Sequence, residues 1–70
     1  MYITREINGV LSYFEGDEPK KGEHVNKYGD KWPMWFNRYG PGKPYVDKEG
    51  RFEKVKWSDE KATFVPGEFH

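Results

Sequence analysis

The stretch Tyr2–Phe14, YITREINGVLSYF, decides the predicted fold. Two runs rich in β-branched and aromatic residues flank Asn8-Gly9, and this dipeptide is the strongest short signal for a β-hairpin. A two-residue type I′ turn would fix the register by pairing Ile7 with Val10. The sequence therefore predicts a hairpin whose core face carries Ile3, Ile7, Val10 and Phe14.

Further strands are predicted in the second half of the chain. Asp47 suits the first position of a turn and Gly50 its left-handed position, so Tyr45–Trp57 is predicted as a second hairpin. Residues 61–65, KATFV, are predicted as the last strand, ended by Pro66-Gly67. The polar stretch 15–29, EGDEPKKGEHVNKYG, is dense in turn-forming residues and is predicted as a loop.

The segment Lys31–Tyr45, KWPMWFNRYGPGKPY, contains five aromatic residues and fits two structures. Pro33 suits the first position of a short helix that closes at Gly40. The same residues also fit a strand, in which Trp35 and Phe36 would point to opposite faces. The sequence leaves helix, strand and loop open for residues 31–45.

Composition favours a single small domain over residues 1–70 with a core of aromatic rings. The chain has 5 Phe, 5 Tyr and 3 Trp, no cysteine, and Leu11 as its one leucine. Leucine-poor chains are poor candidates for helical bundles, whereas each aromatic side chain buries about 150–250 Å². The predicted fold class is mostly β: a small antiparallel sheet or an SH3-like, partly open barrel of four or five short strands with a long irregular middle segment. The predicted core is Ile3, Ile7, Val10, Phe14, Phe52, Trp57 and Phe64.

One short resemblance bears on the barrel alternative. Val55-Lys56-Trp57 and Thr63-Phe64-Val65-Pro66 resemble the VKW…TWEP pattern of chromodomains. The resemblance covers seven residues and implies a strand at 55–57 of an SH3-like barrel. The Gly-aromatic pair that chromodomains carry after the first tryptophan is missing, so no methyl-lysine site is carried over to this chain.

Charge and hydropathy exclude several classes of protein. Twelve basic residues balance twelve acidic ones, which removes the strongest argument for a nucleic-acid or membrane-surface protein, a large basic excess. No apolar run is long enough to span a membrane, and the start MYITREING does not resemble a signal peptide. The lack of cysteine fits a reducing compartment, so the predicted location is cytoplasmic.

Residues suited to catalysis or metal binding are few. His24 lies in a polar stretch, His70 is the last residue, and no serine lies in a GxSxG motif. Lysines interrupt the acidic residues of 15–29, and their charge opposes a cation. The sequence therefore predicts a protein that is not an enzyme and that holds no cofactor and no metal.

The aromatic segment 31–45 is predicted to bind a partner. Trp, Tyr, Phe, Met and Arg are the residues that protein interfaces favour. The predicted partner is another protein or a second copy of the chain, with the chain acting as an accessory regulator or inhibitor, a class that includes phage-encoded proteins. The alternative is a single-stranded nucleic acid held by stacked rings and nearby Lys and Arg. The predicted contact residues are Trp32, Met34, Trp35, Phe36, Arg38 and Tyr39, with Lys43 and Tyr45 at the rim.

Overall fold

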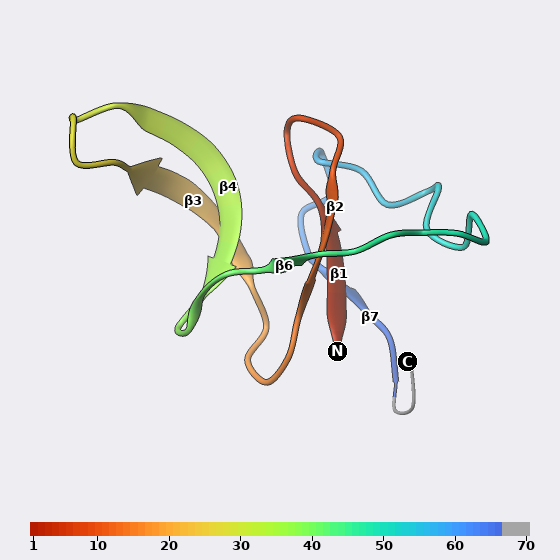
Figure 1. Cartoon of the computed structure of the whole chain (residues 1–70). Coiled ribbons are helices and arrows are strands. Elements are labelled where there is room, and N and C mark those ends of the chain that lie inside the picture. The colour runs from red at the N-terminus through yellow and green to blue at the C-terminus, as the bar shows by residue number, and fades with distance from the viewer. Residues whose placement is uncertain (67–70) are drawn as a thin grey trace.

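The computed structural model describes residues 1–66, and these form two small antiparallel sheets that do not close into a barrel (Figure 1). The described residues contain no helix, and hence none that could cross a membrane. The prediction of a mostly β domain is confirmed. The four-stranded sheet has the order β6-β2-β1-β7, built from Lys43–Pro44, Leu11–Phe14, Tyr2–Arg5 and Thr63–Phe64. The three-stranded sheet has the order β3-β4-β5, built from Lys20–Val25, Lys31–Asn37 and Gly40–Pro41.

The β1–β2 hairpin forms where the sequence predicts it, but in a different register. Gly9 N–H donates to Glu6 O at 2.9 Å, and Glu6 N–H donates to Val10 O at 2.8 Å. Gly9 has φ +91°, and within residues 1–66 no residue other than glycine has positive φ. The loop is therefore a type I turn followed by a glycine bulge, and not the type I′ turn, which would need positive φ at Asn8 as well.

The changed turn shifts the pairing by one residue. Ile3 lies opposite Tyr13 and Arg5 opposite Leu11. Leu11 is consequently buried, whereas Ile7 and Val10 are 57% and 47% exposed. The prediction that Ile7 and Val10 belong to the core is wrong, because the glycine bulge places Ile7 in the turn at the tip of the hairpin and Val10 directly after it.

Both faces of the β1–β2 hairpin are covered. Ile3 and Leu11 pack with Phe52 and Val55 on one face. The neighbouring residues along the same strands point to the opposite face, and there Thr4, Ser12 and Phe14 are also buried. The hairpin therefore forms the middle layer of the domain.

The segment after β6 is a chain of turns and not the predicted second hairpin. Gly50 N–H donates to Asp47 O at 3.4 Å, so a turn does form at the predicted place. The Asp47 carboxylate then accepts the N–H groups of Arg51 and Phe52, both at 2.9 Å. These bonds replace a strand pairing and seat Phe52 in the core. The strand at 55–57 that the chromodomain resemblance implies is also absent from the described residues.

The last strand is confirmed at Thr63–Phe64 and pairs with β1. Val65 N–H donates to Met1 O at 2.8 Å, and the Met1 ammonium donates to Val65 O at 2.9 Å, which extends this pairing. Phe64 is 60% exposed and Trp57 is half-buried, so neither is the core residue that the sequence predicts. Gly67 and His70 lie outside the described residues.

The β3–β4 hairpin occupies two segments, one predicted as a loop and the other left open by the sequence. Lys20–Val25 is a strand, although the sequence predicts a loop there, and Lys31–Asn37 is a strand and not a helix. Their loop repeats the geometry at Gly9: Gly29 N–H donates to Asn26 O at 3.0 Å, Asn26 N–H donates to Asp30 O at 2.9 Å, and Gly29 has φ +84°. Figure 1 shows this hairpin projecting away from the four-stranded sheet.

Candidate functional site

The two faces of the β3–β4 hairpin differ in what they carry. Lys21 pairs with Trp35, and because cross-strand partners share a face, this pair defines the inner face, directed at the rest of the domain. Cross-strand pairs alternate between the two faces of the hairpin. The opposite face, here called the outer face, is formed by the pairs Lys20 with Phe36, Gly22 with Met34, and His24 with Trp32.

The outer face exposes two aromatic rings on either side of Met34. Trp32 is 41% exposed and Phe36 is 38% exposed. The ring of His24 lies against Trp32, with centroids 4.8 Å apart. A Cβ at Gly22 would lie 2.7 Å from the Phe36 ring, so the glycine leaves the space that this ring occupies. The rings are thus fixed against their own sheet while part of each remains in solvent.

The outer face borders two shallow hollows. One, of about 300 Å³, is lined by His24, Met34, Phe36 and Pro41 among others. The other, of about 190 Å³, separates Trp32 and Met34 from Ile7 at the tip of the β1–β2 hairpin. The exposed Ile7 therefore adds apolar surface beside Trp32. An outer face flanked by hollows suits an occupant with protruding side chains.

Trp35 lies on the inner face and is 1% exposed, so it has no surface to offer a partner. Its ring packs edge-on against Trp57 at 6.4 Å, and Lys21 Nζ lies 5.4 Å from its centroid. Lys21 Nζ also donates to Trp57 O at 3.0 Å. The sequence-based assignment of Trp35 to the contact surface is therefore corrected: this indole is core.

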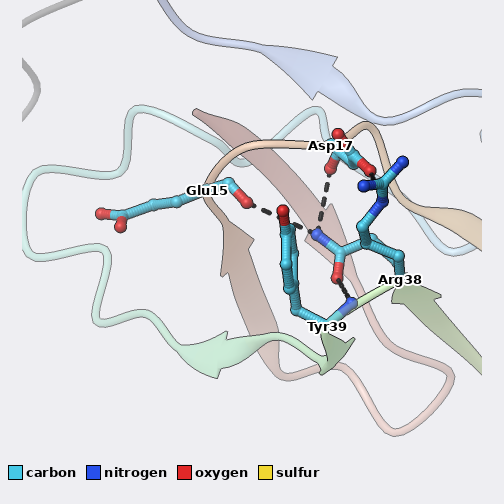
Figure 2. A network of polar contacts seen from close by, with 5 residues as sticks. Glu15, Asp17, Arg38 and Tyr39 are labelled. Atoms are coloured by element: carbon cyan, nitrogen blue, oxygen red, sulfur yellow. Dashed lines mark hydrogen bonds and ion pairs between the residues drawn. The ribbon is translucent and has the colours of Figure 1, made fainter.

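The turn between β4 and β5 holds the next predicted contact residues. Asn37 Nδ2 donates to Asp17 O at 3.0 Å and to Glu15 O at 3.5 Å, while Asn37 Oδ1 accepts the Tyr39 N–H at 2.9 Å (Figure 2). Arg38 forms an ion pair with Asp17. These contacts hold the turn against the loop that precedes β3 and leave the Tyr39 side chain 73% exposed.

A groove of about 360 Å³ runs beside this turn. Its lining comes from two segments of the chain, residues 13–15 and residues 37–43, and includes Tyr13, Asn37, Tyr39 and Lys43. Lys43, an exposed residue of β6, thus lies at the rim of the same region as Tyr39. Tyr45 does not: its N–H donates to Leu11 O at 3.0 Å, and its ring packs on Phe52 at the core.

The site that emerges combines residues predicted from sequence with residues that were missed. Trp32, Met34 and Phe36 share the outer face, with Arg38, Tyr39 and Lys43 beyond its β4 end. Gly22 and His24 were missed because their segment was predicted as a loop. The signal that could have identified them is Asn26-Lys27-Tyr28-Gly29, which fits a three-residue hairpin loop with glycine in the left-handed position.

The described residues hold no cluster of three or more His, Asp or Glu side chains that could bind a metal ion. Comparison with protein-family models, with curated proteins and with solved structures gives no match to this chain.

Proposed function

We propose that this chain is a non-enzymatic domain that binds another protein through the outer face of the β3–β4 hairpin. The observation that supports the proposal is the partial exposure of Trp32 and Phe36 on one face, with Met34 between them. Trp, Phe and Met are enriched where interfaces are most deeply buried, and exposed apolar surface of this kind marks binding sites.

The immobilisation of these rings supports the same proposal. Binding costs about 0.5–1.5 kcal/mol for each flexible side chain that becomes ordered. The His24 ring already restricts the Trp32 ring by packing against it. The Phe36 ring is likewise held in the space over Gly22 that a larger side chain would fill. A partner would therefore meet anchors that are ordered in advance, whereas the Arg38, Tyr39 and Lys43 side chains would supply a polar rim.

The proposed role is that of an accessory regulator or inhibitor, because a domain that acts by contact alone changes its target by occupying part of the target's surface. Association with another protein would also stabilise a chain whose size limits its own core.

Single-stranded nucleic acid is the second candidate ligand, favoured by one contact. The Arg38 guanidinium lies 5.9 Å from the Tyr39 ring centroid, and Tyr39 is 73% exposed. Aromatic rings beside cations stack bases at about 1–3 kcal/mol per base. Nucleic-acid binding usually depends on an excess of basic residues, and this chain has none, so its balanced net charge favours protein binding over nucleic-acid binding.

Affinity capture with matched variants tests the proposal. The bait proteins are the wild type, the double variant Trp32→Ala/Phe36→Ala, and Val46→Ala, which truncates a 72% exposed apolar side chain in the segment after β6. We expect the wild type and Val46→Ala to capture one dominant protein that the double variant loses, while circular dichroism shows all three folded.

Equal capture by the double variant would overturn the outer face as the contact site. Capture that disappears after nuclease treatment, and a complex with labelled single strands that weakens steeply with salt, would favour the nucleic-acid alternative instead.

A further inference from the structure

The three-stranded sheet has a free edge along β3. Trp35 N–H donates to Glu6 and therefore points away from β3, so the Lys21–Trp35 pair is one of the non-hydrogen-bonded pairs of the ladder. Asn26 and Asp30 form a hydrogen-bonded pair at the loop end, and counting alternate pairs from there also makes Lys21–Trp35 a non-hydrogen-bonded pair. The N–H and C=O groups of Lys21, Glu23 and Val25 thus point away from β4, toward the open side of β3.

No hydrogen bond within the described part of the chain reaches these groups, although Glu60 and Lys61 border a hollow beside Lys21. No turn, loop or side-chain hydrogen bond reaches the main-chain amides of Lys21, Glu23 or Val25 there. Five of the six residues of β3 are exposed, and Gly22 is intermediate. A row of unpaired main-chain groups on an exposed strand is a template for pairing with another strand.

We propose that a second copy of this chain pairs with β3 in antiparallel orientation, forming a continuous sheet of six strands. This inference is carried by the strand edge and not by the outer-face partner proposed above, although the two sites share the side chain of Phe36. In a twofold arrangement, two residues form a hydrogen-bonded pair only if the main-chain N–H and C=O groups of both point outward. Within β3, residues 21, 23 and 25 can therefore pair only with the same three residues of the second copy. This condition reduces the possible registers to a few.

Charge selects one of these registers. If Gly22 lies on the twofold axis, Lys21 faces Glu23 of the second copy, and this pair occurs twice. Moving the axis to Glu23 or to Lys21 places two like charges opposite each other, and moving it to His24 or to Val25 pairs at most the last three residues of β3, with no opposite charges among them. Opposite charges across strands stabilise pairing and like charges oppose it, so the Gly22-centred register is favoured.

The glycine on the axis adds an apolar contact. Non-hydrogen-bonded partners bring their Cα atoms to about 4.5 Å. Because each Phe36 ring lies directly over its own Gly22, the two Phe36 rings would meet over the axis on the outer face. The dimer would thus bury the exposed part of Phe36 and pair its edge amides at the same time.

Charge reversal tests the register. Sedimentation equilibrium of the wild type over a range of concentrations is expected to approach twice the monomer mass of 8.3 kDa. Glu23→Lys, which places Lys opposite Lys21, is expected to weaken the dimer at least tenfold. Lys21→Glu should do the same, and circular dichroism checks that this variant folds without the bond from Lys21 Nζ to Trp57 O. An equimolar mixture of the two variants restores opposite charges at both pairs and should form a heterodimer. Glu53→Lys, the same change at an exposed site outside β3, should dimerise like the wild type.

Hydrogen exchange provides a second readout that does not depend on any variant. The amides of Lys21 and Glu23 should exchange more slowly as the concentration of the wild type rises, and not in Glu23→Lys. A wild type that stays at 8.3 kDa at all concentrations, or a Glu23→Lys variant that dimerises equally well, would overturn the proposal. Dimerisation lost in Trp32→Ala but kept in Glu23→Lys would place self-association on the outer face and would also overturn it.

Discussion

The main-chain N–H of Trp35 donates a hydrogen bond to Glu6 Oε1 at 3.1 Å, and this bond joins the three-stranded sheet to the end of β1. It satisfies an amide that β5 does not reach, since β5 pairs only with Phe36 and Asn37. Pro33 precedes Trp35 by two residues and its nitrogen faces the same edge, but proline has no N–H to leave unpaired. This edge of β4 therefore offers fewer unpaired N–H groups than the edge of β3.

Two replacements of Glu6 distinguish the effect of its hydrogen-bond acceptor from the effect of its negative charge. Glu6→Ala leaves the buried Trp35 N–H without a partner, and we expect it to lower the free energy of unfolding by about 1–3 kcal/mol. Glu6→Gln keeps an oxygen at the same position and should cost less than half as much. Urea denaturation of the three proteins measures both changes, and an equal cost for the two variants would contradict the role of this bond.

Truncation of Trp35 should be far more costly than truncation of Trp32. Trp35→Ala creates a cavity between the inner face and Trp57, and we expect a loss of about 3–5 kcal/mol. Trp32→Ala removes a 41% exposed ring and should cost about 1 kcal/mol or less. Thermal unfolding of both variants decides this, and similar losses for the two would show that Trp35 is not the core residue described above.

Trp35→Phe should recover much of that loss. The Trp35 Nε1 atom is buried and has no hydrogen-bond partner among the described residues. A buried unpaired donor costs about 1–3 kcal/mol, and phenylalanine does not carry one. The relief offsets part of the smaller ring's lost packing, so we expect Trp35→Phe to unfold at a free energy closer to the wild type than to Trp35→Ala in the same urea titration.

Arg5 fastens the turn at residues 52–55 to the β1–β2 hairpin. Its guanidinium donates to Val55 O at 2.7 Å, Phe52 O at 3.1 Å and Gly9 O at 2.7 Å. Arg5→Ala should lower the free energy of unfolding by about 2–3 kcal/mol, because a charged donor to main-chain acceptors is lost. Arg5→Lys should recover less than half of it, since an ammonium cannot match the planar fork. Lys54→Ala, an exposed basic residue nearby, is the control and should change stability by less than about 0.5 kcal/mol.

Asp47 holds the first of the turns between β6 and β7. Its two carboxylate oxygens accept the Arg51 and Phe52 amides separately. Asp47→Asn keeps one acceptor and should lose about half of the 1–2 kcal/mol expected for Asp47→Ala, as for side chains that cap main-chain N–H groups. Hydrogen exchange at the Phe52 amide measures the effect locally, and an unchanged exchange rate in Asp47→Ala would be inconsistent with this capping.

The sequence predicts the first hairpin but not its register, and the reason lies in Asn8-Gly9. This dipeptide fits a two-residue loop and also a three-residue loop that ends in a glycine bulge. Hydrophobic alternation normally selects the register, because one face of the strand is polar. Here Ile3 and Leu11 are buried on one face and Thr4, Ser12 and Phe14 on the other, so alternation does not distinguish the two registers.

In the candidate site, neither strand β3 nor the inward face of β4 could be predicted from the local sequence. Strand β3 carries few apolar residues because it is an edge strand, and its polar sequence is typical of a loop. In β4, aromatic rings occupy both faces, so strand periodicity separates Trp35 from Trp32 and Phe36 without telling which face turns inward. That choice is made by tertiary partners distant in sequence, Glu6 and Trp57.

The graded burial of the three indoles gives this domain built-in optical reporters. Trp35 is shielded, Trp57 is half-buried beside it, and Trp32 meets solvent. A soluble quencher such as acrylamide should therefore reach Trp32 emission first, and an occupant of the outer face should remove that accessible fraction. The emission maximum of Trp35 should shift to the red only when the chain unfolds, so one spectrum separates ligand occupancy from loss of structure.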